Sequence, residues 1–398
     1  MITLFLIPVY ILFSFYICRW LFRWMNACHR WFQKKWMKMV IVAAYAFASS
    51  TIIISFLLPV SPVQRVLKRI GNYWLGVLLY ILLVILVVDL IRIVLKKTKW
   101  ITPEVLHSRR TFVVSGALCI CVIAAVSIYG ITNARHIRTT TYNVEINKDG
   151  GKIADLKIAL AADLHLGYSI GPYHMEQMVE KINAMDADIV LIAGDIFDNE
   201  YEAIRDPDRI ISILREIKSK YGVYACYGNH DIQEKILVGF TFPGEEKKQS
   251  DPRMDELLEK SGITLLRDES LLIDDSFYLV GRPDYRKPGR GIDIRKSPEE
   301  VVEGLDMTKP VIVLEHEPVE MEELAETGVD MQLCGHTHDG QLWPGTITIN
   351  LFWENPCGYL KKGNMHSIVT SGIGVYGPAM RVGSRSEVCE INVDFDDM

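Results

Sequence analysis

Gly335-His336-Thr337-His338 stands at the end of the alternating run from Val329 to Cys334. Alternation of apolar and polar residues predicts a β-strand, and the glycine after it predicts a turn at the strand's C-terminal end. On a regular strand, side chains two residues apart share one face, whereas in a tight turn they can diverge and hold two neighbouring metal ions. Taken alone, the simplest interpretation is a polar turn that happens to contain histidines.

Four more turns rich in metal-ligand residues lie upstream, each after a strand-like run. They are Asp163-Leu164-His165, Gly194-Asp195-Ile196-Phe197-Asp198, Gly228-Asn229-His230-Asp231 and Leu314-Glu315-His316-Glu317-Pro318. Five of the seven histidines after Gly151 lie in these five turns. Because ligands gather at the carboxyl ends of strands in an α/β sheet, we expect the turns to converge. Mixed imidazole and carboxylate ligands suit Zn, Mn or Fe, and suit Mg less well.

Charge divides the 398 residues into two parts. Residues 1–138 contain 17 Lys and Arg but only two acidic residues, and the rest has a net charge near −21. DNA and RNA bind through phosphate neutralisation by Lys and Arg, so the acidic part argues against a nucleic-acid partner. The eight cysteines show no C-x-x-C spacing, which predicts free thiols.

Four runs in the basic part carry no charged side chain, and a bilayer core is crossed by roughly 20 apolar residues. They are Met1–Cys18, Val40–Val60, Gly71–Val88 and Thr111–Ala134. We therefore expect a transmembrane region over residues 1–136, with helices at about 2–22, 39–60, 72–95 and 111–134. Between the first two, recurring Trp and basic residues predict an interfacial helix at about 23–38.

Basic residues in the loops predict the orientation of a multi-pass protein of the cell membrane. The loops 19–38 and 96–110 have six and five Lys and Arg, more than the other connections. The positive-inside rule places them in the cytoplasm, so the acidic domain would be extracytoplasmic. Four dispersed cysteines in that domain leave the inverted orientation open.

After Arg138 the pattern changes to alternating strands and helices, which favours a layered α/β domain over residues 137–398. Helices are predicted at 174–185, 208–220, 254–260 and 317–326. The last short runs, at 347–349, 368–370 and 388–393, come without long helices between them. They predict a second, more antiparallel sheet.

In order, the five turns spell D-x-H, G-D-x-x-D, G-N-H-D, a lone His and G-H-x-H. This pattern resembles the calcineurin-like metallophosphoesterase superfamily, over roughly residues 139–398. The resemblance implies a four-layer αββα sandwich, in which two mixed sheets are flanked by helices. The stretch from Gly335 to Gly345 looks like the branch of membrane-associated bacterial phosphodiesterases, in which Gly is usual where this chain has Asp339.

The resemblance also implies two divalent metal ions (Mn, Zn, Fe or Mg), with Asp195 shared between them. The other ligands would be Asp163, His165 and His338 for one ion and Asn229, His316 and His336 for the second. Such ions lie roughly 3.5–4 Å apart and convert a bridging water into a hydroxide that attacks phosphorus in line. His230 would protonate the leaving oxygen, Asp231 would orient His230, and Asp198 would lie behind the ligands.

Arginines can grip phosphate with two hydrogen bonds. Arg282, Arg286, Lys287 and Arg290 form a local basic cluster, and Arg381 resembles an Arg common in the bacterial branch. Arg282, Arg286 and Arg381 are therefore candidate substrate contacts, with a solvated charged loop as the alternative. The stretch 237–250 is either a lid or a surface excursion.

Together these features predict a membrane-anchored dinuclear phosphodiesterase. Its substrate would be a phosphodiester or pyrophosphate in a small molecule, lipid headgroup or envelope polymer, and its other partner the lipid bilayer. Two alternatives remain: a cytoplasm-facing hydrolase of nucleotides or nucleotide-lipids, and an inactive membrane sensor or scaffold. An inactive member should lack ligands, whereas every motif is complete here.

Overall fold

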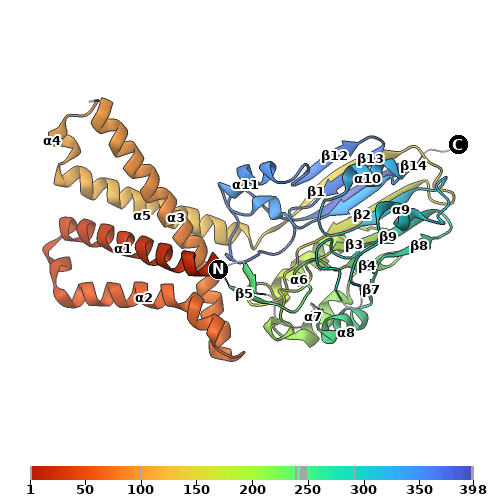
Figure 1. Ribbon diagram of the computed structural model, residues 1–398, viewed down its shortest axis with the longest axis horizontal. Coiled ribbons are helices and arrows are strands. Elements are labelled where there is room, and N and C mark those ends of the chain that lie inside the picture. Colours follow the sequence, from red (N-terminus) through yellow and green to blue (C-terminus); the bar gives the residue numbers. More distant parts are fainter. Residues whose placement is uncertain (1, 99, 238–239, 243–248, 290–291, 396–398) are drawn as a thin grey trace. The chain divides into compact units, whose positions relative to one another are not determined.

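The computed structural model describes the whole chain except residues 1, 99, 238–239, 243–248, 290–291 and 396–398. It consists of two compact units, Met1–Gly130 and Ile131–Met398 (Figure 1). The first is helical, and the second contains two six-stranded sheets and all five ligand-rich turns.

The described residues of the helical unit form four long helices and two short ones. They are α1 (Ile2–Cys28), η1 (Arg30–Gln33), α2 (Lys35–Leu57), α3 (Pro62–Thr98), α4 (Pro103–Leu106) and α5 (Arg109–Asn133). Within the described residues, only α2, α3 and α5 are long and apolar enough to be membrane-span candidates. The prediction of four spans is therefore corrected to three. Arg19 and Arg23 lie in the C-terminal half of α1 among aromatic residues, and charged side chains oppose insertion.

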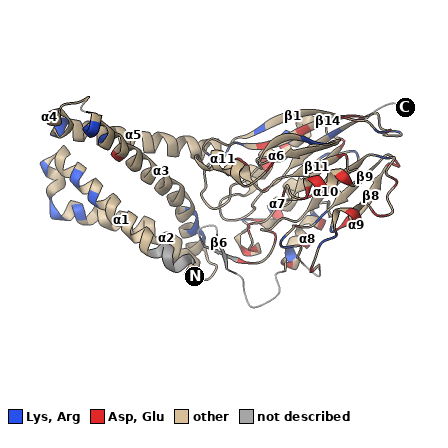
Figure 2. Ribbon diagram, turned by 45° about the horizontal axis from the view of Figure 1, so that its top comes forward, with Lys and Arg blue, Asp and Glu red and all other residues tan. Residues whose placement is uncertain are grey.

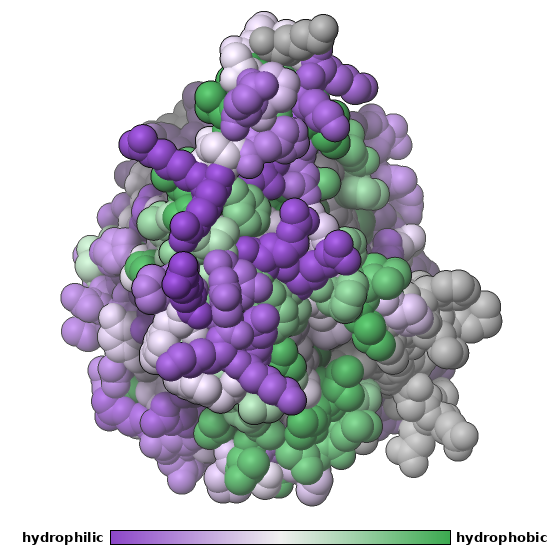
Figure 3. Space-filling view, turned by 90° about the vertical axis from the view of Figure 1, so that its left-hand side faces the viewer, coloured by the Kyte–Doolittle hydropathy of each residue, from purple (hydrophilic) through white to green (hydrophobic). Residues whose placement is uncertain are grey.

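The predicted interfacial helix at 23–38 is also wrong, because no single helix spans these residues. α1 ends at Cys28, the Nδ1 atom of His29 accepts the N–H of Trp31 (3.1 Å), and α2 begins only at Lys35. Lys and Arg gather near the helix ends, whereas acidic residues are concentrated in the second unit (Figure 2). Seen end-on, the helical unit shows long hydrophilic side chains beside hydrophobic ones (Figure 3).

Two six-stranded mixed sheets form the second unit. The first has the order β1 (Ile137–Ile146), β14 (Ser386–Phe395), β2 (Asp155–Ala161), β3 (Ile189–Ala193), β4 (Val223–Cys226) and β7 (Ile263–Leu265). The second has the order β12 (Gly358–Lys362), β13 (Met365–Val369), β11 (Met331–Cys334), β10 (Val311–Leu314), β9 (Phe277–Gly281) and β8 (Glu269–Ile273). The core lies between the sheets, because Leu160 and Leu191 of the first share one buried cluster with Leu279 and Ile312 of the second.

Helices complete an αββα arrangement (Figure 1). They are α6 (Pro172–Met185), α7 (Pro207–Leu214), α8 (Pro252–Lys260), α9 (Pro298–Val302) and α10 (Met321–Glu326). The strands β3 and β10 are uninterrupted aliphatic runs, as expected for parallel strands covered on both faces. Prolines in the first turn start four of these helices, α6, α7, α8 and α9, and Ser297 and Glu300 form a capping box on α9.

Three local predictions need correction. Residues 347–349 form no strand but belong to α11 (Gly345–Thr348) and η4 (Ile349–Leu351). The run 388–393 joins the first sheet as β14, between β1 and β2, with parallel pairing to β1 and antiparallel pairing to β2. The second sheet was predicted to be more antiparallel, but it is mixed, since β13 is parallel to β11 and antiparallel to β12.

The stretch predicted to be either a lid or a surface excursion, residues 237–250, overlaps two short antiparallel strands, β5 (Lys235–Leu237) and β6 (Phe240–Phe242). The rest of it lies largely outside the described residues. All eight cysteines are free. The fold brings the ends of β2, β3 and β4 from one sheet to the ends of β10 and β11 from the other, where the five turns begin.

Candidate metal centre

The backbone of the candidate ligands is unusual, because five of these non-glycine residues have a positive φ. They are Asp163 (54°), His165 (46°), Asp195 (49°), His336 (77°) and His338 (52°). Such conformations are costly and cluster at functional sites. The turns after β2 and β3 support one another, since the N–H groups of Asp163 and His165 donate to the carbonyls of Gly194 and Asp195 (both 3.0 Å).

Two glycines let the turns approach this closely. A Cβ atom on Gly228 would lie 2.3 Å from Oδ1 of Asp195, and one on Gly335 would lie 2.6 Å from Oδ2 of Asp163. Real Cβ atoms do not approach other atoms so closely, so only glycine fits beside either carboxylate.

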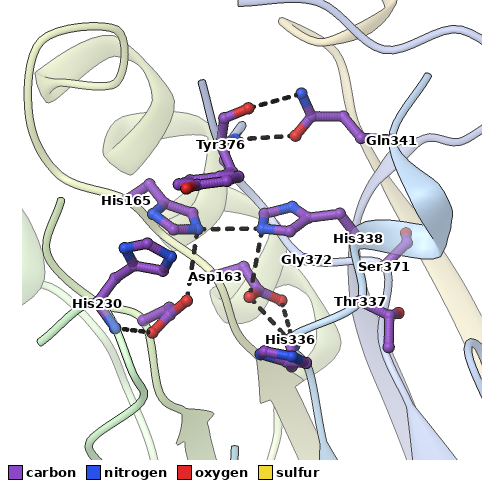
Figure 4. Close-up of polar contacts among 12 residues, drawn as sticks. Asp163, His165, His230, His336, Thr337, His338, Gln341, Ser371, Gly372 and Tyr376 are labelled. Atoms are coloured by element: carbon purple, nitrogen blue, oxygen red, sulfur yellow. Dashed lines mark hydrogen bonds and ion pairs between the residues drawn. The ribbon is translucent and has the colours of Figure 1, made fainter. Parts of the chain in front are cut away.

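Among the described residues, the first group of converging ligand atoms comes from Asp163, His165 and His338, all buried. Nε2 of His338 lies 3.0 Å from Nε2 of His165 and 3.5 Å from Oδ1 of Asp163. The carboxylate of Asp163 also accepts the backbone N–H of His336 (3.1 Å), which ties the turns after β2 and β11 together. Figure 4 shows these side chains facing one another.

The second group comes from Asp195, His316 and His336. Nε2 of His316 lies 3.1 Å from Oδ2 of Asp195 and 3.2 Å from Nδ1 of His336. Oδ1 of Asn229 lies 3.0 Å from the same Nδ1 atom and adds an amide oxygen. The histidines of the G-H-x-H turn therefore diverge into different groups.

Asp195 connects the two groups. Its Oδ2 atom lies 3.1 Å from Nε2 of His316 and 3.7 Å from Nε2 of His165. Its Oδ1 atom accepts the backbone N–H of His230 (2.7 Å), which holds the carboxylate in this orientation. One buried carboxylate thus faces both sets of ligands.

The donor geometry fits bound metal ions. Around an ion held by imidazole nitrogens at about 2.0–2.1 Å, neighbouring ligand atoms lie roughly 2.9–3.4 Å apart. The closest contacts within the groups are 3.0 Å between His165 and His338 and 3.1 Å between His316 and Asp195. Nδ1 of His316 lies 2.8 Å from the carbonyl of Ala193 and donates to it, which turns the other nitrogen toward the site, as is usual for metal ligands.

Electrostatics keep most of these rings neutral. Burial lowers the pKa of His165 and of His336 to about 3, so their nitrogens keep lone pairs for a cation. Burial raises the pKa of Asp163 to about 7. Burial opposes ionisation of Asp195 and His316 as well, but their mutual attraction holds the pKa of Asp195 well below and that of His316 well above the usual value.

His230 is buried beside the groups, and its partner differs from the prediction. Its Nδ1 atom lies 2.5 Å from Oδ1 of Asn199. The predicted partner, Asp231, instead accepts the N–H groups of Phe197 (2.8 Å) and Gly228 (2.6 Å). Asp231 therefore fastens two ligand turns, and Asn199 orients the ring. Asn199 directly follows the G-D-x-x-D motif, a position that sequence reasoning did not consider.

Tyr376 is a second residue that sequence reasoning missed. Its ring lies 4.6 Å from that of His230 and 5.7 Å from that of His165 (Figure 4). Gln341 holds it there, because its Oε1 atom accepts the N–H of Tyr376 (2.8 Å) and its Nε2 atom donates to the carbonyl (2.9 Å). No local motif marks Tyr376 in the sequence.

The candidate substrate arginines occupy different environments. Arg282 is fully buried and pairs with Glu315 (3.1 Å) and Glu320 (2.9 Å). Arg381 is also fully buried, and its Nη2 atom lies 3.1 Å from Nδ1 of His338. Both side chains are inside the protein and are held by other protein groups, so the prediction that Arg282 and Arg381 contact the substrate is not retained. The side chain of Arg286 is 74% exposed and lies 4.0 Å from Glu317.

The other cationic members of the cluster are Lys287 and Arg290. Lys287 pairs with Glu234 (2.6 Å), and Arg290 lies outside the described residues. Asp198 lies beside the first group, with Oδ1 3.9 Å from Nδ1 of His165.

Comparison with known proteins agrees with this geometry. Residues 156–340 match the calcineurin-like phosphoesterase family. This segment is a calcineurin-like metallophosphoesterase domain. The match confirms the resemblance at the level of the superfamily, whereas the bacterial branch remains a prediction.

Proteins similar to this chain occur in animals and bacteria. A "transmembrane protein with metallophosphoesterase domain" from Danio rerio is 30% identical over 292 residues, covering 69% of this chain and 61% of that protein. Its Bos taurus namesake is 27% identical, covering 72% and 64%. An "uncharacterized metallophosphoesterase" from Helicobacter pylori strain J99 is 28% identical, covering 60% of each chain. The chain thus spans less than two thirds of the length of these relatives.

Proposed function

We propose that this protein is a membrane-anchored phosphohydrolase that depends on two divalent metal ions and cleaves phosphodiesters. The observation that carries the proposal is the position of Asp195, whose Oδ2 atom faces both buried ligand groups at 3.1 and 3.7 Å. A shared carboxylate between two such groups is the arrangement that two-metal hydrolases need.

The ligand assignment follows the two groups. One ion would be held by Asp163, His165, Asp195 and His338, and the other by Asp195, Asn229, His316 and His336. Bound there, the ions would supply an activated water nucleophile and neutralise charge on the phosphoryl oxygens. Imidazole and carboxylate ligands of this kind are compatible with Mn, Zn or Fe.

His230 acts as the general acid in this proposal. An amide oxygen can only accept a hydrogen bond, so Nδ1 of His230 donates to Oδ1 of Asn199. Nε2 is then the nitrogen that exchanges a proton with the leaving oxygen. Arg286, the most exposed of the three candidate arginines, remains as the contact for a phosphate group.

The anchor and its orientation belong to the same proposal. The helices α2, α3 and α5 are the membrane-span candidates, and the two most basic loops would face the cytoplasm. The metal centre would then be extracytoplasmic and would act on lipid headgroups or other envelope phosphodiesters. A reporter fused at the C-terminus distinguishes this orientation from the inverted one, which would favour a cytoplasmic nucleotide or nucleotide-lipid.

The full chain, purified in detergent and loaded with Mn, tests the reaction. We expect it to hydrolyse bis(p-nitrophenyl) phosphate faster than p-nitrophenyl phosphate. Asp195→Asn should lose about 10³-fold in rate, since several kcal/mol of transition-state stabilisation are removed. Asp394→Asn, at an exposed carboxylate of β14, is the matched control. A wild-type protein that binds two metal ions yet is no faster than Asp195→Asn would be a sensor, and the proposal would be wrong.

A further inference from the structure

The segment from Gln341 to Trp353 is an unusual surface for a domain with so much negative charge. It contains no charged side chain. Four of its large apolar residues are exposed: Trp343 (44%), Ile347 (62%), Leu351 (80%) and Phe352 (79%). Ile347 lies on α11, and Leu351 lies on η4, which follows α11 directly. Contiguous exposed apolar surface of this kind marks an interaction site.

Hydrogen bonds fix this apolar segment, residues 341–353, next to the end of α5. Asn133, the last residue of α5, is buried in the second unit and donates from Nδ2 to the carbonyl of Ser384 (2.8 Å). The hydroxyl of Ser384 donates to the carbonyl of Gln341 (2.9 Å), and the N–H of Trp343 donates to the carbonyl of Val382 (2.7 Å). One short loop before β14 therefore holds both the segment and Asn133.

The position of Asn133 indicates what covers the segment. Because α5 is a membrane-span candidate that ends at Asn133, this residue lies near the boundary of the bilayer in the anchored protein. Tyr359 and Lys361, exposed on alternate positions of β12, add two side-chain types that settle at the headgroup level. A partner protein would require no such proximity to the end of a span.

The same segment leads to the metal centre. The ring of Trp353 lies 5.0 Å from that of His336, a candidate ligand of the second group. Thr337, the residue after His336, is tied to the chain just after the apolar segment, because its hydroxyl donates to the carbonyl of Pro356. A surface docked through the apolar segment would thus be presented close to the metal ligands.

We propose that residues 343–352 dock on the lipid bilayer, with the side chains of Trp343, Ile347, Leu351 and Phe352 among the headgroups and upper acyl chains. Resting on the proposed function, this assigns the substrate class as phosphodiesters of lipid headgroups, which the docked segment brings to the ligands. The docking follows from the exposed apolar side chains and the hydrogen bonds around Ser384, whereas the substrate class also requires the proposed phosphodiesterase activity.

Photo-crosslinking tests the docking without any activity measurement. The full chain is reconstituted into nanodiscs of phosphatidylcholine with a minor share of phosphatidylglycerol, with p-benzoylphenylalanine in place of Phe352. The control carries it in place of Leu272, a 42% exposed residue on β8, at the opposite edge of the second sheet from β12. We expect lipid adducts by mass spectrometry at position 352 and not at 272. Equal yields at both positions, or adducts with a second protein chain instead of lipid, would overturn the docking.

Substitution tests the substrate class. In a Leu351→Ser/Phe352→Ser variant, the ratio of kcat/KM for a phosphodiester lipid in vesicles to that for bis(p-nitrophenyl) phosphate should fall about tenfold or more, because two apolar side chains that the bilayer would cover are removed. Leu272→Ser should keep the wild-type ratio. An unchanged ratio in the double variant would refute the lipid assignment. If wild type hydrolyses neither ester, the proposed function fails, while the crosslinking result still decides the docking.

Discussion

Replacing Arg381 with methionine should destabilise the second unit and weaken metal binding at the first ligand group. The Arg381 guanidinium is fully buried and donates to the carbonyls of Ser371 (2.6 Å), Gly374 (2.7 Å), His338 (3.2 Å) and Gly372 (3.3 Å). Its Nη2 atom also lies 3.1 Å from Nδ1 of His338. A single side chain therefore ties the loop before β14 to a candidate metal ligand.

The magnitude follows from these contacts. Methionine fills similar space but donates nothing, so four carbonyls lose a donor, at about 1–3 kcal/mol for each one that stays buried and unpaired. Removing a buried cation offsets part of this loss, and local water satisfies some of the carbonyls. We expect a net destabilisation of about 3–5 kcal/mol, which corresponds to a fall in Tm of roughly 10 °C. His338 also loses its orienting contact, so metal affinity should fall about 10–100-fold.

Thermal unfolding in detergent and metal content by mass spectrometry measure both effects on the full chain. Arg209→Met is the control, because the side chain of Arg209 is 53% exposed and should contribute little. If Arg381→Met does not fold, Arg381→Lys serves instead: it keeps the charge but lacks the planar fork of donors, so an intermediate loss of Tm and metal is expected. A substituted protein with wild-type Tm and two bound metal ions would refute the reasoning.

Three further predictions follow from the site and its surroundings. His230→Gln should keep both metal ions but lower kcat by about 10²–10⁴-fold, as expected for loss of a general acid, and loss of metal instead would show that the ring supports the ligands. Burial lowers the pKa of His174 from 6.5 to about 4, so its neutral form contributes stability above pH 6.5 that is lost as the pH falls toward 4. The unfolding free energy of wild type should therefore decrease with falling pH more steeply than that of His174→Phe, by up to about 1.4 kcal/mol per pH unit, and equal slopes would contradict this. Burial raises the pKa of Asp163 to about 7 in the metal-free protein, so a cation must displace a proton at lower pH. Affinity for Mn at the first group, measured by equilibrium dialysis, should fall roughly tenfold per pH unit below 7, and a pH-independent affinity would exclude the assignment.

Local pattern was enough to locate the candidate metal ligands. The metal-ligand residues are recognisable because each group stands just after a strand-like run, and strand period and turn residues are local properties. The expectation that the ligand-rich turns would converge rested on the rule that ligands gather at the carboxyl ends of strands. The turns do converge, into one group of Asp163, His165 and His338 and a second group of Asp195, His316 and His336. The uncharged runs likewise located α2, α3 and α5 as membrane-span candidates.

Tertiary structure alone decided what depends on contacts between distant parts of the chain. Pairing across the first sheet draws the last strand, β14, between β1 and β2, and no local signal encodes that insertion. The choice of Asn199 over Asp231 as partner of His230 depends on how two turns pack, and so do the positive φ angles of the ligands. From the sequence, Arg381 was predicted as a candidate substrate contact, with a solvated charged loop as the alternative. Only the fold, by surrounding it with carbonyl groups from separate turns, makes burial of its charge favourable and gives it a structural position.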